Sequence, residues 1–416
     1  MSRIDELIER LCPDGVPFEP LSAIGEWYGG GTPSKGRPEF WQNGTIPWAS
    51  PKDMGRAIVD TTEDYITEAA VKGSATRLVP PTSVAMVVRS SILDRIFPTA
   101  LVPVPVALNQ DMKAVVPRDG ILPGYVAHIL RSRGHAILRF ARKTGGSVAS
   151  IESKKLFSFR IPIPPVAVQE EIVQVLDLFR TLEAELEAEL EARRRQYAFY
   201  RDSLLTFPEA VVRRIPMGDA GSFFGGLTGK SKADFSDGNA RFVSYVNVFK
   251  NIAVNLQAGD FVHVESGERQ RQIQRGDILF TGSSETPDEV GMSSVVTTDT
   301  NEPTFLNSFS IGYRLNEPDL LDPEFAKHLF RSTGMRQQIV RTASGVTRFN
   351  VSKARLAKID FPLPAKDEQI RIARVLDNFE LLVNDLSIGL PAELAARRKQ
   401  YEYYSDRLLT FEEAVA

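Results

Sequence analysis

The sequence predicts an α+β protein with a pseudo-twofold tandem repeat, in which two globular domains are separated by two long helices that form an antiparallel coiled coil. Three observations predict this fold: an internal repeat, two stretches with coiled-coil spacing, and short strand-like runs between turns elsewhere. The length of 416 residues allows two to three average domains, and 43% hydrophobic with 25% charged residues is typical of globular proteins.

The chain repeats itself with a shift of 200 to 204 residues. Pro-x-Pro followed by Gln-x-x-Ile occurs at 162–172 and again at 362–372. Arg-Arg-x-Gln-Tyr followed by Leu-Leu-Thr-Phe also occurs twice. The second copy of the repeat holds four extra residues between its Gln-x-x-Ile motif and its Arg-Arg-x-Gln-Tyr motif. In the globular parts, His128 and His328 keep the shift of 200, and Gly226–Gly229 is a weak echo of Gly30–Pro33. The repeat predicts a first globular domain at 1–160, a central helical spacer at 161–210, a second globular domain at 211–360 and a C-terminal helical spacer at 361–416.

Apolar residues step by three and four through both helical parts, as in a coiled-coil seam with one stutter. The first seam comprises Ile172, Val175, Phe179, Leu182, Leu186, Leu190, Tyr197 and Leu204. The second comprises Ile372, Val375, Phe379, Leu382, Leu386, Leu390, Leu394, Tyr401 and Leu408. Gly389 and Pro391 predict a weak point or kink in the second helix. An amphipathic helix packed on its own domain is the alternative, but two matched copies favour the coiled coil.

Each globular part reads as a mainly antiparallel sheet followed by helices. The expected strands are 82–88, 102–107 and 113–116 in the first part, and 242–248, 277–281 and 293–297 in the second. Helical stretches are expected at 124–142 and 323–341.

The net charge of −3 argues against a uniformly basic nucleic-acid binder, but basic residues gather at matched places. Residues 131–160 form basic belt 1, and residues 327–358 form basic belt 2. We expect the belts to bind nucleic-acid phosphates through Arg131, Arg139, Arg142, Lys143, Lys154 and Lys155, and through Arg331, Arg336, Arg341 and Lys353. A solvated helix face is the alternative for either belt alone.

Catalytic and metal-binding motifs are missing from the sequence. Gly225–Ser231 resembles a phosphate loop, but Phe224 stands where the first glycine is required. Cys12 is the single cysteine, and the four histidines lack zinc-ligand spacing. His128 and His328 favour packing roles over catalysis. We therefore expect no catalytic activity in this chain. No run of apolar residues is long enough to span a membrane, and the first residues lack a signal core, so we expect a cytoplasmic protein.

Taken together, these motifs resemble the specificity subunits of type I restriction-modification systems. The matching residues include Leu11–Val16, Gly31–Ser34 followed by Ile46–Trp48, and the repeated helix motifs. The resemblance implies two target-recognition domains that each read one half of a split, asymmetric site in double-stranded DNA, separated by a spacer that sets the unread gap. It also implies docking of two modification (methyltransferase) subunits and of restriction (translocase and endonuclease) subunits. S-adenosylmethionine, ATP and Mg²⁺ are then expected in those partners, with no cofactor or metal in this chain.

Base edges are read by side chains that donate and accept hydrogen bonds. The candidates are Thr32, Ser34, Lys35, Trp48 and Lys52 in the first domain, and Thr228, Lys230, Asn247, Arg348 and Asn350 in the second. Gly226–Gly229 departs from the family pattern because it lacks the Pro-Ser of the first copy. Two other hypotheses stay open at this point: a coiled-coil adaptor that assembles partners without reading DNA, and an enzyme with an unrecognised site.

Overall fold

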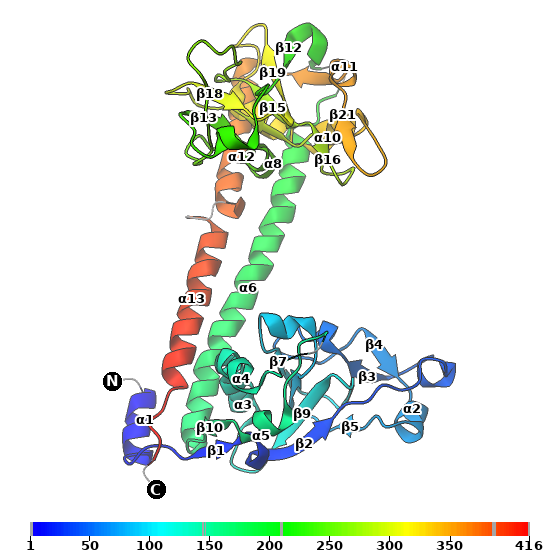
Figure 1. Ribbon diagram of the computed structural model, residues 1–416, viewed down its shortest axis with the longest axis vertical. Coiled ribbons are helices and arrows are strands. Elements are labelled where there is room, and N and C mark those ends of the chain that lie inside the picture. Colours follow the sequence, from blue (N-terminus) through cyan, green and yellow to red (C-terminus); the bar gives the residue numbers. More distant parts are fainter. Residues whose placement is uncertain (1–2, 144, 146, 209–210, 385–387, 415–416) are drawn as a thin grey trace. The chain divides into compact units, whose positions relative to one another are not determined.

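The computed structural model describes residues 3–143, 145, 147–208, 211–384 and 388–414 (Figure 1). The chain forms two compact units: Met1–Leu186 with Leu394–Ala416, and Glu187–Glu393. Each unit contains one globular domain and parts of the long helices. Within the described ranges, no helix has the length and apolar character needed to cross a bilayer.

The domain of unit 1 is built on two four-stranded sheets. One has the antiparallel order β2 (Gly25–Gly29), β9 (Met112–Pro117), β6 (Ser83–Val87), β7 (Thr99–Val102). The other has the order β4 (Asp64–Ile66), β3 (Ile46–Ala49), β8 (Val106–Leu108), β5 (Leu78–Val79), in which β3 and β8 are parallel. A separate pair joins β1 (Phe18–Pro20) to β10 (Arg160–Pro162). The helices are α1 (Arg3–Leu11), α2 (Glu68–Gly73), α3 (Pro123–Ser132), α4 (Gly134–Ala141) and α5 (Ser153–Ser158).

The domain of unit 2 repeats this plan. Its main sheet has the antiparallel order β12 (Gly221–Gly225), β19 (Ser310–Leu315), β15 (Ile278–Thr281), β17 (Ser293–Val295). One three-stranded sheet has the order β14 (Phe261–Val262), β13 (Ala240–Val243), β18 (Thr304–Leu306). A second three-stranded sheet has the order β16 (Ser283–Ser284), β21 (Phe349–Val351), β20 (Ala343–Ser344). Another pair joins β11 (Arg213–Pro216) to β22 (Asp360–Leu363). The helices are α7 (Met217–Ala220), α8 (Tyr245–Lys250), α9 (Pro323–Leu329), α10 (Thr333–Val340) and α11 (Lys353–Leu356).

The α+β class and the tandem repeat are confirmed, but two expected strands are wrong. The stretch 102–107 is divided, because β7 ends at Val102 and β8 begins at Val106. The stretch 242–248 ends as a strand at Val243, since the Ser244 side chain accepts a hydrogen bond from Asn247 N and caps α8. The helical stretches 124–142 and 323–341 are each two short helices.

The long helices are α6 (Val166–Leu204), α12 (Lys366–Asn384) and α13 (Leu390–Leu408). In unit 1, the first half of α6 runs antiparallel to α13, with Phe179 stacked on Tyr404 at 5.2 Å and Glu183 bound to Arg398 at 2.7 Å. In unit 2, the second half of α6 packs on α12, and Tyr200 stacks on Phe379 at 5.4 Å.

The seams differ from the expectation at several positions. Ile172 belongs to the core of its own domain, so the first turns of α6 serve as a domain helix. Leu182 and Leu382 are exposed, and Leu386 lies outside the described residues. The second spacer is two helices, because α12 ends at Asn384 and α13 begins at Leu390, next to Pro391.

Candidate nucleic-acid interface

Five backbone segments converge beside the main sheet of unit 2. We call them loop cluster 2: residues 226–228, 243–246, 282–284, 307–309 and 348–351. Backbone hydrogen bonds join them: Leu227 N to Leu306 O (2.7 Å), Asn307 N to Val243 O (3.1 Å), Gly282 N to Phe309 O (2.8 Å) and Val351 N to Gly282 O (2.9 Å). The loops are therefore held as one rigid group.

Unit 1 contains the same arrangement in loop cluster 1: residues 30–32, 49–52, 88–90, 109–111 and 148–151. Each bond has its counterpart: Gly31 N to Leu108 O, Asn109 N to Ala49 O, Val88 N to Asp111 O and Ile151 N to Val88 O, all at 2.8 Å. The two clusters thus share one backbone scaffold.

The scaffold explains the weak sequence echo between Gly30–Pro33 and Gly226–Gly229. A Cβ atom on Gly30 would lie 1.8 Å from Asn109 O, and one on Gly226 would lie 1.9 Å from Asn307 O. Only glycine allows this close approach of two backbones. The glycine is therefore required by packing, while the residues after it are free to differ.

Several predicted base-reading residues lie exposed in or next to these clusters. They are Thr32, Ser34, Lys35, Lys52, Thr228, Arg348 and Asn350. Arg348 Nη2 donates to Ser283 Oγ at 2.9 Å, and the Asn350 amide donates to Arg348 O at 3.3 Å. Hydrogen bonds to Glu63 and Asp64 raise the pKa of Lys52, which therefore stays charged.

Three other predicted base-reading residues have enclosed side chains. Trp48 is 4% exposed, and its Nε1 donates to Gly31 O at 3.1 Å. Asn247 is 6% exposed, and its amide donates to Asn255 O at 2.8 Å. The Lys230 side chain is enclosed and pairs with Glu268, whose pKa it lowers to about 2. These enclosed side chains therefore hold the loops in place.

The belts also divide by burial. The guanidinium of Arg331 donates to the carbonyls of Val248, Phe249, Asn251 and Ser293 at 2.5 to 3.1 Å. Arg336 donates to the carbonyls of Asp288, Val290 and Gly291. Burial lowers the pKa of both arginines to about 10. Arg131 likewise donates to Thr99 O at 3.2 Å. These three arginines therefore stabilise the domains through backbone carbonyls.

The other belt residues are exposed. They are Arg139, Arg142, Lys143, Lys154, Lys155, Arg341 and Lys353. Arg142 pairs with Asp94, and Lys155 pairs with Glu152 at 2.9 Å. Lys353 Nζ is 3.9 Å from the point where a Cβ on Gly225 would lie, which places this ammonium beside loop cluster 2. Basic belt 2 therefore reaches the cluster.

Sequence reasoning missed Phe309, Tyr245 and Arg89. Phe309 is 65% exposed at the tip of a turn, and Tyr245 lines a cavity of about 500 Å³ in loop cluster 2. Arg89 takes the place of Ser283 in loop cluster 1, and its Nε lies 3.9 Å from Asp111. An aromatic residue inside the polar turn Asn307–Ser310 was the available signal.

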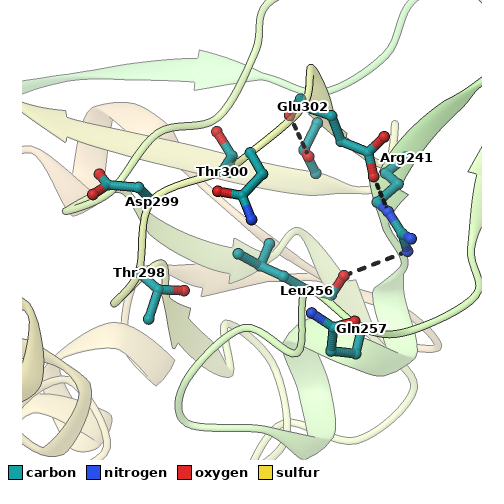
Figure 2. Close-up of a pocket in the computed structure, with 9 residues that line it drawn as sticks. Arg241, Leu256, Gln257, Thr298, Asp299, Thr300 and Glu302 are labelled. Atoms are coloured by element: carbon teal, nitrogen blue, oxygen red, sulfur yellow. Dashed lines mark hydrogen bonds and ion pairs between the residues drawn. The ribbon is translucent and has the colours of Figure 1, made fainter.

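A second cavity of about 540 Å³ lies apart from these residues (Figure 2). Figure 2 shows Thr298, Asp299 and Thr300 on one side and Gln257 opposite. Arg241 pairs with Glu302 and donates to Ala258 O at 3.2 Å. No predicted site residue lines this cavity.

The two repeated histidines connect each domain to its helices. His128 Nε2 is 2.9 Å from Asp177 Oδ1, and Nδ1 is 3.3 Å from the Tyr401 hydroxyl. His328 Nε2 is 2.7 Å from Asp377, and Nδ1 is 3.2 Å from the Tyr197 hydroxyl. Each histidine thus joins one domain to two helices of the same unit. Among the described residues, no three His, Cys, Asp or Glu side chains are grouped to hold a metal ion.

Comparison with known proteins agrees with this architecture. A family model for type I restriction modification DNA specificity domains matches residues 13–192 and 260–396. The specificity subunit of type I restriction enzyme EcoR124I/EcoR124II from Escherichia coli is 59% identical over 198 residues, 47% of this chain and 49% of that protein. A putative type I restriction enzyme specificity subunit from Haemophilus influenzae is 28% identical over 275 residues, 64% of this chain and 68% of that protein. The chain therefore aligns with about half the length of the Escherichia coli relative.

Solved structures show the same fold. The S subunit of a type I restriction-modification system from M. genitalium matches with a TM-score of 0.52 at 13% identity, over 95% of this chain and 96% of that one. A chain from a study of complex assembly and conformational transition in a type I R-M system matches with a TM-score of 0.64 at 14% identity, over 95% and 98%. The family match covers most of the sequence in both units. The chain belongs to the type I restriction modification DNA specificity family.

Proposed function

We propose that this chain is the non-catalytic specificity subunit of a type I restriction-modification complex, and that each domain reads one half of a split, asymmetric DNA site. One observation carries the proposal: the two loop clusters share a backbone scaffold but present different side chains. Arg89 and Asp111 in loop cluster 1 stand where loop cluster 2 has Ser283 and Phe309. Two half-sites of different sequence require different side chains at equivalent places.

The proposed contacts are the exposed members of the predicted set. Base edges are assigned to Thr32, Ser34, Lys35, Lys52, Thr228, Arg348 and Asn350, and phosphates to Arg139, Arg142, Lys143, Lys154, Lys155, Arg341 and Lys353. Phosphate contacts supply affinity that depends on salt, whereas base contacts supply the sequence preference. We assign the reading domains to 1–160 and 211–360, and the spacers to 161–210 and 361–416.

Two modification subunits are the proposed partners of the long helices. Phe199 on α6 and Tyr403 on α13 occupy matched repeat positions and are 66% and 61% exposed. Each lies edge-on to the next aromatic residue, Tyr200 at 5.6 Å and Tyr404 at 5.4 Å. Exposed aromatic residues are typical centres of protein interfaces, and two equivalent patches favour two copies of one partner. S-adenosylmethionine, ATP and Mg²⁺ would act in the modification and restriction subunits, in the cytoplasm.

Methylome mapping tests this function. The chain is co-expressed with its cognate modification subunit, and methyladenine is mapped along the host DNA. We expect one split, asymmetric motif, and exchange of residues 1–160 for those of a relative should change one half of it only. Methylation without a split motif, or a change in both halves, would contradict two independent readers.

The adaptor hypothesis predicts a different outcome. An assembly protein that does not read DNA would keep its partners and show no DNA affinity to lose when Arg139, Lys143 and Lys154 are replaced by alanine. These three residues are exposed, so their replacement leaves the fold intact, unlike replacement of Arg331 or Arg336. A reader should lose DNA affinity in the triple variant while its complex with the modification subunits stays unchanged.

A further inference from the structure

We infer that Phe309 is a base-stacking residue: its ring packs on a nucleobase that has lost its neighbour in duplex DNA, while Arg348 binds the edge of an adjacent guanine. The inference deepens the proposed function and rests on it, because it assigns a recognition mode to the second half-site. Aromatic and apolar side chains that enter between base steps are a general means of deforming duplex DNA.

The exposure of Phe309 is built into the fold. Asn307 is 5% exposed, and its Oδ1 accepts a hydrogen bond from Phe309 N at 2.9 Å. Asn307 Nδ2 donates to Val243 O at 2.9 Å, and Phe309 O accepts from Gly282 N at 2.8 Å. The turn is therefore fixed on both sides of the ring. A large apolar side chain that a fixed turn holds out in water is available to a partner without further ordering of the backbone.

The cavity beside Phe309 fits flat rings. It measures about 500 Å³ and is lined by aromatic side chains, two serines, two glutamates and Arg348. Tyr245 and Phe249 form one wall, with ring centroids 6.1 Å apart and planes inclined by 14°. The Tyr245 hydroxyl donates to Ser283 O at 2.8 Å, which fixes that wall. Base-aromatic stacking tolerates any base, because every base has a π face.

Arg348 gives the site its polar selectivity. Its Nε and Nη2 donate to Ser283 Oγ at 3.1 and 2.9 Å. In the part of the chain that the structure describes, no carboxylate forms an ion pair with it. Glu289, which also lines the cavity, instead accepts from Thr286 Oγ1 at 2.7 Å. The remaining guanidinium hydrogens are left for an acceptor-rich edge, and O6 with N7 of guanine is the edge that arginine binds most often.

The rim favours DNA over a protein partner. Ser283, Ser284, Glu285 and Arg348 surround Phe309 with hydrogen-bonding groups, whereas the core of a protein interface is depleted in charge. Loop cluster 1 carries Asp111 at the equivalent turn position, where stacking is impossible. Apart from the adenines that the modification subunits extrude, the inference therefore predicts an unstacked base in the second half-site alone.

The experiment uses the full chain in complex with its modification subunits, bound to a duplex carrying the mapped site. 2-Aminopurine replaces one base at a time in each half-site, and binding is followed by anisotropy of a separate label. Methyltransferases extrude their target base, so a rise at the methylated adenine of either half-site is expected and is not counted. Wild-type complex should also raise 2-aminopurine fluorescence at one further step, in the second half-site. Phe309→Ala should remove that rise and weaken binding about tenfold, whereas Phe309→Tyr should keep both. Val211→Ala is the matched control, since Val211 is 74% exposed in the same domain and lies outside basic belt 2.

The outcomes distinguish base stacking by Phe309 from the proposed DNA-reading function. If wild-type complex prefers the mapped site but shows no fluorescence rise at any step besides the methylated adenines, or if Phe309→Ala behaves as wild type, base stacking is overturned. If wild-type complex binds the mapped site no better than a scrambled duplex, the proposed function itself fails. Thermal unfolding of each variant checks that its domain stays folded.

Discussion

Arg331 and Arg341 belong to the same basic belt, but burial gives them different roles. Arg331 donates to four backbone carbonyls, whereas Arg341 is exposed. Arg331→Ala would leave those carbonyls buried without donors, so we expect the free energy of unfolding of unit 2 to fall by about 3 kcal/mol. Arg341→Ala should change it by less than about 0.5 kcal/mol. Urea unfolding of both variants measures the difference, and equal stabilities would contradict the structural role of Arg331.

His128 should make unit 1 sensitive to acid. Burial lowers the pKa of this histidine, although its hydrogen bond to Asp177 opposes the shift. A histidine in the unfolded chain has a pKa of about 6.5, so below that pH the unfolded chain binds more protons than the folded one. The free energy of unfolding should therefore fall as the pH drops below about 6.5, by at most about 1.4 kcal/mol per pH unit from this group. Thermal unfolding at pH 7.5 and 5.5 measures the loss, and His128→Gln should reduce it. An equal loss in the variant would assign the effect to other groups.

Residue type was predictable from the sequence, whereas burial was not. Trp48, Asn247 and Lys230 have the chemistry of base readers, but the structure uses their donors to hold loop backbones and a carboxylate. Conversely, the Phe309 side chain has no hydrogen-bonding group, so its sequence position does not predict a site residue, although the fold exposes it. Which polar side chain faces water depends on tertiary packing, and one sequence does not contain that information in its local pattern.

At the level of elements, the strongest repeats mark joints between helix and domain. Gln169 Oε1 accepts from Leu122 N at 2.8 Å, and Gln369 Oε1 accepts from Asp322 N at 2.7 Å. Their amides donate to Pro164 O at 2.7 Å and Pro364 O at 3.0 Å. The Pro-x-Pro and Gln-x-x-Ile motifs therefore recur because each domain is attached to its helix by the same bonds. These motifs therefore predicted where α6 and α12 begin. The strand expected at 242–248 instead ends at Val243, because Ser244 caps the helix that follows.

The matched aromatic residues predict the stoichiometry of assembly. Removing the ring of Phe199 or Tyr403 deletes the centre of one proposed docking patch and leaves the other, so each single alanine variant should bind one modification subunit tightly instead of two. The double variant should lose both. Mass photometry of the complexes measures the count. Val211→Ala, at a residue that is 74% exposed, is the control. Two tightly bound copies in both single variants would place the interface elsewhere.

For the whole molecule, the near-neutral total charge conceals separated charges. The net charge is −3, yet residues 131–160 carry eight Lys and Arg against Glu152 alone. The compensating acids include Glu183, Glu185, Glu187, Glu189 and Glu191, all on α6. DNA responds to the local potential of a surface within about 8 Å at physiological salt, and acids beyond that range are largely screened. Net charge therefore says little about binding in a protein that divides its charges between a domain and a helix.

The salt dependence of binding tests this division directly. Each phosphate contact releases counterions, so the slope of log affinity against log salt changes by about 0.9 for every phosphate that the protein no longer neutralises. The variant Arg139→Ala, Lys143→Ala, Lys154→Ala should make the slope shallower by up to about 2.7, while the methylated motif stays the same because no base contact is removed. Lys72→Ala, an exposed lysine outside the belt, should leave the slope unchanged. Affinity is measured for the assembled complex between about 50 and 200 mM salt, as is usual for such slopes. An unchanged slope in the triple variant would mean that basic belt 1 faces away from the DNA, and a changed motif would mean that its residues read bases.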